Sequence, residues 1–184
     1  MATSHFIVGG ARSGKSRFAR ATLGDRRRVV FVATAQAGDR DMAERIARHR
    51  AERPRHWRTI EEPFALTPRL TSLAGEADAV VVDCVTVWLA NLLLRGDTDA
   101  QILAAGDELA AVGGRALFDL TLVSNEVGEG VVPATADGVR FRDVLGSANQ
   151  RLAAACDRVT LMVAGLPLTV KAPGTGHDVT LQTA

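Results

Sequence analysis

Eight residues near the start of the chain have the types and spacing of a phosphate-binding loop. Gly9-Gly10-Ala11-Arg12-Ser13-Gly14-Lys15-Ser16 fits the pattern G-x-x-x-x-G-K-[ST] and directly follows the apolar run Phe6-Ile7-Val8. In such a loop the backbone N–H groups and the N-terminus of the next helix bind phosphate oxygens. Lys15 would reach the β- and γ-phosphates of a nucleotide, and the Ser16 hydroxyl would hold Mg²⁺. The motif therefore predicts chemistry on a nucleoside triphosphate.

The lysine of this motif is unusual within the chain. Only Lys15 and Lys171 are lysines among 22 basic residues, so arginine is used almost everywhere else. A compact ammonium group fits between two phosphates under a tight loop, whereas a planar guanidinium does not. The exception at this position supports a functional loop over a chance match.

An acidic residue follows a second apolar run. Residues 79–82 are apolar and Asp83 comes next, which is the pattern of the carboxylate that anchors Mg²⁺ directly or through water in phosphate-loop enzymes. Asp83 can instead cap a helix that begins near Thr86, although the upstream loop favours the metal role. Asn125 and Glu126 follow a later apolar run and emerge at the same edge, where turn chemistry explains them as well as ligand binding does.

A helix predicted from about Asp39 to Arg53 has a basic side. Arg45, His49 and Arg53 recur at intervals of four beside an apolar stripe, and an anionic partner would relieve their repulsion. A solvated basic face is the simpler alternative. The imidazole of His49 could attack the α-phosphorus of a nucleotide and leave a phosphoramidate, but a single helical histidine can equally be ordinary.

The apolar runs and the helical patterns alternate along the chain. Runs buried on both faces and separated by helices indicate a doubly wound α/β fold with a mostly parallel sheet and helices on both faces. Ligands bind outside the carboxyl ends of the strands in such folds. We predict strands near 6–8, 29–32, 79–82, 117–123 and 159–163, and helices near 15–23, 40–53, 66–73, 86–94, 98–112 and 141–156.

The composition limits the class of protein. The 184 residues form one expected domain, 1–184, with a loose tail over 172–184. With 47% hydrophobic residues and a net charge of +1, the chain is globular and has no general attraction to nucleic acid or to a membrane surface. No run is apolar enough for membrane insertion, so we expect a cytoplasmic protein. Cys84 and Cys156 are expected to be buried thiols rather than a zinc site.

Together the blocks resemble one family, the bifunctional adenosylcobinamide kinase/adenosylcobinamide-phosphate guanylyltransferases of cobalamin synthesis. The resemblance runs from about residue 6 to Lys171. Beyond the phosphate loop, it is carried by Ala33-Thr34, Arg45-Ile46, His49-Arg50, Arg53-Pro54, Trp57-Arg58-Thr59, Asp83-Cys84-Val85-Thr86, Asn91-Leu92-Leu93, Asn125-Glu126-Val127-Gly128, Val132-Pro133, Phe141-Arg142-Asp143 and Asn149-Gln150-Arg151-Leu152.

This resemblance implies a phosphate-loop fold, a homotrimer and two reactions. In the first, adenosylcobinamide takes a γ-phosphoryl group from ATP or GTP. In the second, GTP guanylylates an enzyme histidine, and adenosylcobinamide phosphate then takes the GMP group to give adenosylcobinamide-GDP. Mg²⁺ is the implied cofactor. The chain shows no aromatic-rich pocket for the corrinoid, so we expect that ligand at a subunit interface.

The resemblance also implies roles for individual residues. His49 matches the guanylylated histidine, and Arg48 stands where some relatives have a second histidine. Ala35 stands where relatives often have serine. Ser16 and Asp83 would hold the metal, and the implied nucleotide contacts are Gly9, Gly10, Ala11, Arg12, Ser13, Gly14, Lys15, Ser16, Thr34, Ala35, Arg50, Ala51, Glu52, Arg53, Glu61 and Asp83.

Two other functions remain open from the residues alone. In one, the protein is a monofunctional phosphate-loop kinase of a small alcohol and His49 is a bystander. In the other, it is a nucleotide-dependent switch or a nucleic-acid-associated NTPase that docks through the arginine-rich helix.

Overall fold

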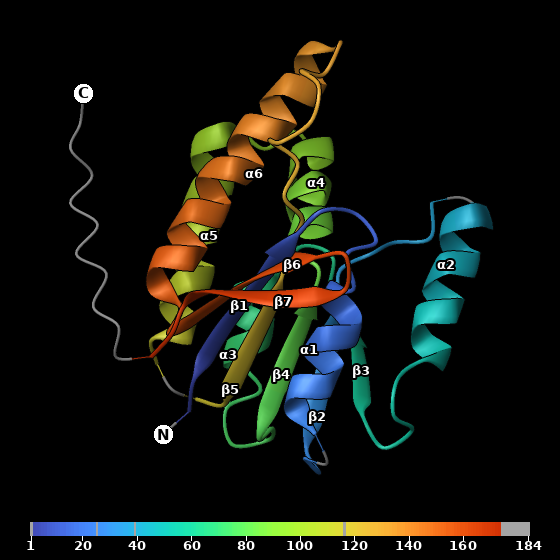
Figure 1. Cartoon of the computed structure of the whole chain (residues 1–184), viewed down its shortest axis with the longest axis vertical. Coiled ribbons are helices and arrows are strands. Elements are labelled where there is room, and N and C mark those ends of the chain that lie inside the picture. The colour runs from blue at the N-terminus through green and yellow to red at the C-terminus, as the bar shows by residue number, and fades with distance from the viewer. Residues whose placement is uncertain (1, 25, 39, 116, 174–184) are drawn as a thin grey trace.

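A seven-stranded sheet forms the centre of the molecule (Figure 1). The computed structural model describes residues 2–24, 26–38, 40–115 and 117–173, without the side chains of Arg40, Asp41, Met42 and Arg45. The strand order is β3-β2-β4-β5-β1-β6-β7. The strands are β1 (Ser4–Gly9), β2 (Val29–Ala33), β3 (Arg58–Glu61), β4 (Ala79–Asp83), β5 (Asp119–Val123), β6 (Arg158–Val163) and β7 (Leu166–Lys171).

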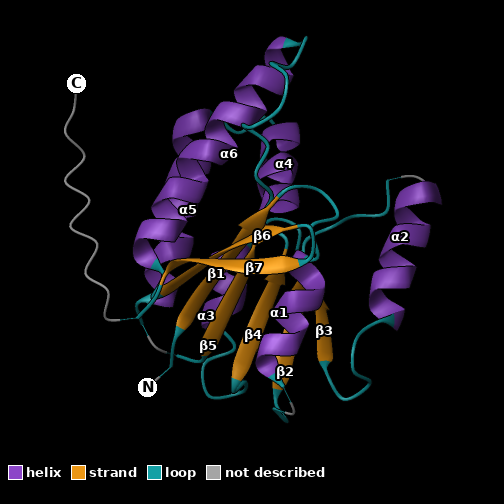
Figure 2. Ribbon diagram, viewed as in Figure 1, coloured by secondary structure: helices purple, strands orange, loops and turns teal. Residues whose placement is uncertain are grey.

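The first six strands are parallel, and β7 pairs antiparallel with β6. Successive residues of the central strands face opposite sides of the sheet, so Val30 and Val32 join one core while Val29 and Phe31 join the other. Both sides are apolar because both are covered by other elements (Figure 2). The predicted doubly wound α/β fold is confirmed.

The helices divide unequally between the two faces. The larger core holds side chains of α3, α4, α5 and α6, whereas the smaller core holds side chains of α1. Helix α2 stands apart at the side of the sheet (Figures 1 and 2). The helices are α1 (Lys15–Leu23), α2 (Arg40–Ala51), α3 (Leu66–Thr71), α4 (Val85–Arg95), α5 (Asp99–Gly113) and α6 (Ala136–Ala155).

All five predicted strands and all six predicted helices are present. The structure also has two strands that the sequence analysis did not predict. These are β3 and β7 at the two edges of the sheet. Helix α2 ends at Ala51, so Arg53 lies beyond the helix and does not extend its basic face as predicted. Helix α6 begins at Ala136 rather than near 141, because the Thr135 side chain accepts a hydrogen bond from the Gly138 N–H and caps it.

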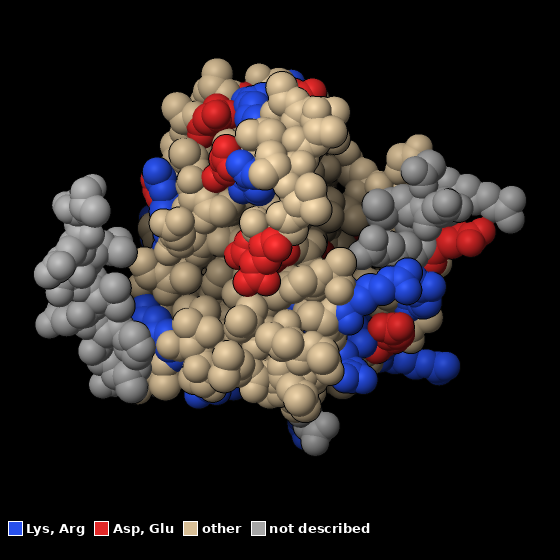
Figure 3. Space-filling view, turned by 45° about the horizontal axis from the view of Figure 1, so that its top comes forward, with Lys and Arg blue, Asp and Glu red and all other residues tan. Residues whose placement is uncertain are grey.

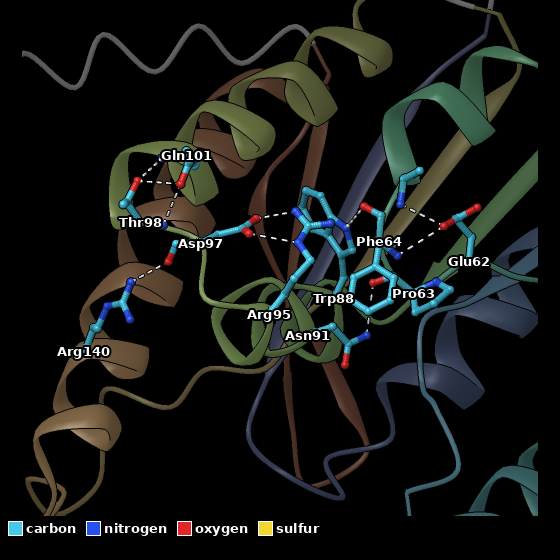
Figure 4. A network of polar contacts seen from close by, with 11 residues as sticks. Glu62, Pro63, Phe64, Trp88, Asn91, Arg95, Asp97, Thr98, Gln101 and Arg140 are labelled. Carbon is cyan, nitrogen blue, oxygen red and sulfur yellow. Dashed lines mark hydrogen bonds and ion pairs between the residues drawn. The ribbon is translucent and has the colours of Figure 1, made fainter.

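Polar contacts fix the segment that follows β3 against α4 (Figure 4). Trp88 donates to the Phe64 carbonyl at 2.9 Å, and Glu62 accepts from the N–H groups of Phe64 and Ala65. The Asn91 amide donates both to the Pro63 carbonyl and to the Thr34 carbonyl, at 3.1 and 2.8 Å. The ends of β2 and β3 therefore share one support on α4.

Among the described residues, no helix is long and apolar enough to cross a membrane. The predicted tail falls largely on residues 174–184, which lie outside the described residues. The prediction of one domain over 1–184 stays a prediction.

Candidate active site

The phosphate loop joins the carboxyl end of β1 to α1 in a conformation that needs its glycines. Gly14 precedes α1 with φ +93°, in the left-handed region that favours glycine. A Cβ atom on Gly9 would lie 2.5 Å from the Met162 carbonyl oxygen, so the loop backbone can approach β6 only because this residue is glycine. The Gly165 N–H, in the turn between β6 and β7, donates to the Ser13 carbonyl at 3.0 Å. The neighbouring hairpin thereby supports the loop.

Lys15 is buried beneath this loop. Its ammonium donates to the carbonyls of Gly9 and Gly10 at 2.8 and 2.6 Å, and only 7% of the residue is exposed. These bonds hold the ammonium charge against the loop, whose backbone N–H groups have the arrangement that binds phosphate in loops of this kind.

A cleft of about 360 Å³ opens beside the loop. Its acidic residues are Glu52 and Asp83, and four arginines make the rest of its lining strongly basic. The lining residues are Ala11, Arg12, Ser13, Gly14, Lys15, Ser16, Arg17, Arg20, Arg48, His49, Glu52, Asp83, Cys84, Val123 and Asn125. Figure 3 shows basic side chains gathered on the side of the molecule that carries α2. Such a lining attracts a polyanion such as a triphosphate.

A second cleft of about 160 Å³ adjoins the first. It is lined by Ala33, Ala35, Ile46, His49, Arg50, Arg53, Glu61, Asp83, Cys84, Val87 and Asn125. Four residues, His49, Asp83, Cys84 and Asn125, line both clefts. The imidazole of His49 therefore faces the same space as the phosphate loop, although the two are more than 30 positions apart in the sequence.

Arg53 is held in place by aromatic and polar contacts. Its guanidinium carbon lies 3.7 Å from the centre of the Phe31 ring, and one N–H donates to the Thr59 hydroxyl at 3.2 Å. Burial lowers the pKa of Arg53, although Asp83 opposes the shift, and the guanidinium remains charged. Arg50 lies 4.0 Å from Glu61 across the same cleft.

Comparisons with known proteins identify the family of this chain. Residues 5–170 match the family model described as cobinamide kinase / cobinamide phosphate guanyltransferase. The chain belongs to this family. It is 48% identical over 169 residues to the bifunctional adenosylcobalamin biosynthesis protein CobP of Pseudomonas aeruginosa, covering 90% of this chain and 95% of that one. It is 42% identical over 177 residues to the bifunctional adenosylcobalamin biosynthesis protein CobU of Salmonella typhimurium, covering 90% and 98%.

Family membership confirms the resemblance and the enzyme class that the sequence predicted, a bifunctional kinase and guanylyltransferase. Most residues expected to contact the nucleotide do line the two clefts. Gly9 and Gly10 act through their carbonyls, which hold Lys15. Glu52 accepts from Arg20 at 3.0 Å, and this ion pair ties the end of α2 to α1.

Gly9, Gly10 and two further expected nucleotide contacts, Thr34 and Ala51, line neither cleft. Thr34 is completely buried, and its hydroxyl donates to the Cys84 carbonyl and accepts from the Cys84 N–H. Ala51 is exposed and lines a separate hollow beside Trp57. Thr34 thus joins the ends of β2 and β4, while its neighbour Ala35 borders the second cleft.

Arg17, Arg20, Cys84 and Val87 line the clefts without having been predicted to do so. Burial, helped by the charge of Asp83, raises the pKa of the Cys84 thiol to about 11, so this sulfur is protonated at neutral pH and is a poor nucleophile. Cys84 directly follows Asp83 at the end of β4, which is a local signal, whereas Arg17, Arg20 and Val87 have none, because the folding of α1 and α4 against the strand ends brings them to the clefts.

Proposed function

We propose that the protein phosphorylates adenosylcobinamide with ATP or GTP, and then transfers GMP from GTP through a guanylyl-His49 intermediate to give adenosylcobinamide-GDP. One observation supports this most strongly: His49 lines both the phosphate-loop cleft and the cleft that contains Arg50, Arg53 and Glu61. A nucleotide held by the loop would have its α-phosphorus within this shared space.

In the kinase reaction the acceptor hydroxyl oxygen forms a bond to the γ-phosphorus. The bond from that phosphorus to the bridging oxygen breaks, the nucleoside diphosphate leaves with the electron pair, and the hydroxyl proton passes to solvent. In this proposal Lys15 and the loop N–H groups stabilise the charge on the phosphate oxygens.

In the guanylyl reaction an imidazole nitrogen of His49 forms a bond to the α-phosphorus of GTP, and pyrophosphate leaves with the electron pair. A phosphate oxygen of adenosylcobinamide phosphate then attacks the same phosphorus, and the P–N electron pair returns to the imidazole. Arg48 and Arg50 flank His49 on α2 and would stabilise charge on the departing pyrophosphate.

Ser16 and Asp83 would hold Mg²⁺. A hydroxyl and a carboxylate are the oxygen ligands that this ion prefers, and both line the first cleft. The described residues contain no group of three or more His, Cys, Asp and Glu side chains suited to a metal. Nucleotide phosphates and water would then complete the shell, as is usual for Mg²⁺. The bound ion would neutralise charge on the phosphates.

Covalent labelling tests the guanylyl-histidine step. The protein is incubated with GTP labelled at the α-phosphate, and we expect an attachment that is labile in acid and stable in base. His49→Ala should lose the label and keep kinase activity. His56→Ala, at an exposed histidine that contacts the Arg26 carbonyl, should take label normally.

Other results would favour the alternatives. If the wild-type protein takes no label but still phosphorylates cobinamide, it is a monofunctional kinase. Steeply salt-dependent binding to RNA or DNA without cobinamide turnover would indicate the nucleic-acid-associated NTPase. Kinase assays with ATP and with GTP, run side by side, define the donor.

We also propose that the protein is a homotrimer and that its edge hairpin lies at the subunit contact, with the corrinoid bound nearby. Val163, Leu166 and Leu168 are 55%, 71% and 57% exposed, and they share one face of β6 and β7. Leu168→Lys should lower the mass found by analytical ultracentrifugation, whereas Leu94→Lys, at an 83% exposed leucine of α4, should not. A monomeric wild type, or equal masses in all three proteins, would contradict this.

A further inference from the structure

Asn125 lies at the junction of the two clefts. Of the four residues that line both, Asp83 has a carboxyl group, Cys84 a thiol and His49 the proposed nucleophile. Asn125 contributes a carboxamide, which can donate two N–H groups without bringing a charge. It is therefore suited to bind a nonbridging phosphate oxygen in each of the two proposed reactions.

The backbone at Asn125 is held on both sides of the residue by the phosphate-loop strand. The Ser124 N–H donates to the Ile7 carbonyl at 2.9 Å, and the Glu126 N–H donates to the Gly9 carbonyl at 3.1 Å. The Gly9 carbonyl also accepts the Lys15 ammonium. A shared acceptor therefore sets the position of Asn125 relative to Lys15.

A buried network fixes the peptide groups of Asn125 itself. Its N–H donates to the Thr86 hydroxyl at 2.7 Å, and its carbonyl accepts from the Asn149 amide at 3.0 Å. Ser124 connects these partners, since its hydroxyl bonds to Asn149 at 2.8 Å and lies 3.2 Å from the Thr86 hydroxyl. Ser124, Thr86 and Asn149 are 0%, 6% and 7% exposed. Buried and satisfied polar networks of this kind hold a backbone rigidly.

The side chain, by contrast, is left available. Within the described residues, the hydrogen bonds of Asn125 engage only its N–H and its carbonyl, so its side-chain amide makes none. A residue whose backbone is anchored by α4 and α6 while its amide faces two clefts has the arrangement of a preorganised ligand contact.

We propose that the Asn125 amide donates to a nonbridging oxygen of the transferred group and positions the phosphorus for both reactions. This inference rests on the proposed function. Attack on the γ-phosphorus and attack on the α-phosphorus both increase the demand for donors at nonbridging oxygens, and a neutral donor serves both. The chemical class recognised is the phosphate chain of a nucleoside triphosphate.

Two substitutions at this site separate a donor role from a structural one. Asn125→Ala removes the amide, and Asn125→Asp keeps its shape but replaces the donor with an anion beside the phosphates. We expect single-turnover rates of γ-phosphoryl transfer and of α-label incorporation to fall about 10- to 100-fold in Asn125→Ala and further in Asn125→Asp. Nucleotide Kd should change less than about threefold, because the interaction strengthens on approach to the transition state.

Gln150 provides the matched control. It is exposed on α6, beside Asn149, and Gln150→Ala and Gln150→Glu make the same chemical changes away from the clefts. Both should retain wild-type rates. Thermal unfolding of all variants checks the fold, and Asn125→Asp carries the test if Asn125→Ala unfolds, because the anchoring peptide groups and the side-chain shape are kept.

Three results would overturn the inference: wild-type rates in Asn125→Asp, a loss confined to one of the two reactions, or a raised nucleotide Kd with an unchanged rate of transfer. Failure of the proposed function is distinct, since it is seen as wild-type protein that takes no α-label. In that event the phosphoryl-transfer rate of Asn125→Asp still decides the role of Asn125.

Discussion

At the scale of single residues, Lys15 offers the clearest test of the phosphate loop. Its ammonium is held by two loop carbonyls and lies in the cleft where a triphosphate would bind. Lys15→Ala should lower phosphoryl transfer by about 100-fold or more, because it removes the cation that balances charge on the transferred group. Initial rates with saturating nucleotide measure this.

The other lysine of the chain serves as the control. Lys171 donates to the carbonyls of Ala153 and Ala154 at the end of α6, away from the clefts. Lys171→Ala should turn over substrate at the wild-type rate. If Lys15→Ala bound and turned over nucleotide normally, the eight-residue motif would have no catalytic role here.

The place of a residue in the fold could be predicted from sequence where the pattern was local. Asp83 ends β4, and Lys15 and Ser16 begin α1 after the short loop that leaves β1, so their position at the carboxyl edge could be read from neighbouring residues. Thr34 also follows a strand, yet it lines neither cleft, because its hydroxyl satisfies both backbone groups of Cys84. Hydrogen bonds between the residues that follow β2 and β4 therefore keep the Thr34 hydroxyl away from the clefts.

At the scale of elements, the β6–β7 hairpin supports the phosphate loop. Gly165 has φ +85° and donates to Ser13, and a Cβ there would lie 3.3 Å from a guanidinium nitrogen of Arg17. Gly165→Ala should lower the free energy of unfolding by about 1–2 kcal/mol through backbone strain. It should also weaken nucleotide binding severalfold, because the loop loses part of its support. Chemical denaturation and nucleotide titration measure the two effects.

Gly75 allows the strain to be measured alone. It has φ +79°, and a Cβ there would meet no atom within 4 Å. Gly75→Ala should therefore lower the free energy of unfolding by about as much as Gly165→Ala does, and leave nucleotide affinity unchanged. Equal nucleotide affinities in the two variants would show that the hairpin does not act on the loop.

The elements missed by the sequence are the edge strands. In β3 the run Arg58-Thr59-Ile60-Glu61 is short and has only one apolar residue, since an edge strand is not covered on all sides. In β7, Pro167 argues against a strand, but a proline is tolerated where the N–H side of the strand faces no neighbour. Similarly, no local pattern shows that α2 brings His49 to the clefts that Asp83 also lines, because this placement depends on how the chain returns from α2 to β3.

At the scale of the whole molecule, His5 makes the stability of the fold depend on pH. It lies in β1, where an imidazole nitrogen is 2.8 Å from the Thr160 hydroxyl and the ring meets the edge of Phe18. Burial, with a smaller contribution from the charge of Arg158, lowers the pKa of His5 to about 4 from 6.5. Between these values the unfolded chain binds more protons than the folded one, so stability rises with pH.

We therefore expect the contribution of His5 to the free energy of unfolding to be fully present above pH 6.5. It should be lost as the pH falls toward about 4, and the free energy should not change further through this group below that pH. The loss due to this group should be about 1–2 kcal/mol after allowance for its partial exposure. Asp157, whose pKa is lowered by hydrogen bonds from Ser4, affects stability only at lower pH, because its usual pKa is 3.8.

His5→Gln removes the titrating group but keeps an amide for Thr160. Urea unfolding at pH 7 and pH 4.5 should therefore show a smaller difference in His5→Gln than in the wild type, and an equal difference would mean that His5 does not set this dependence.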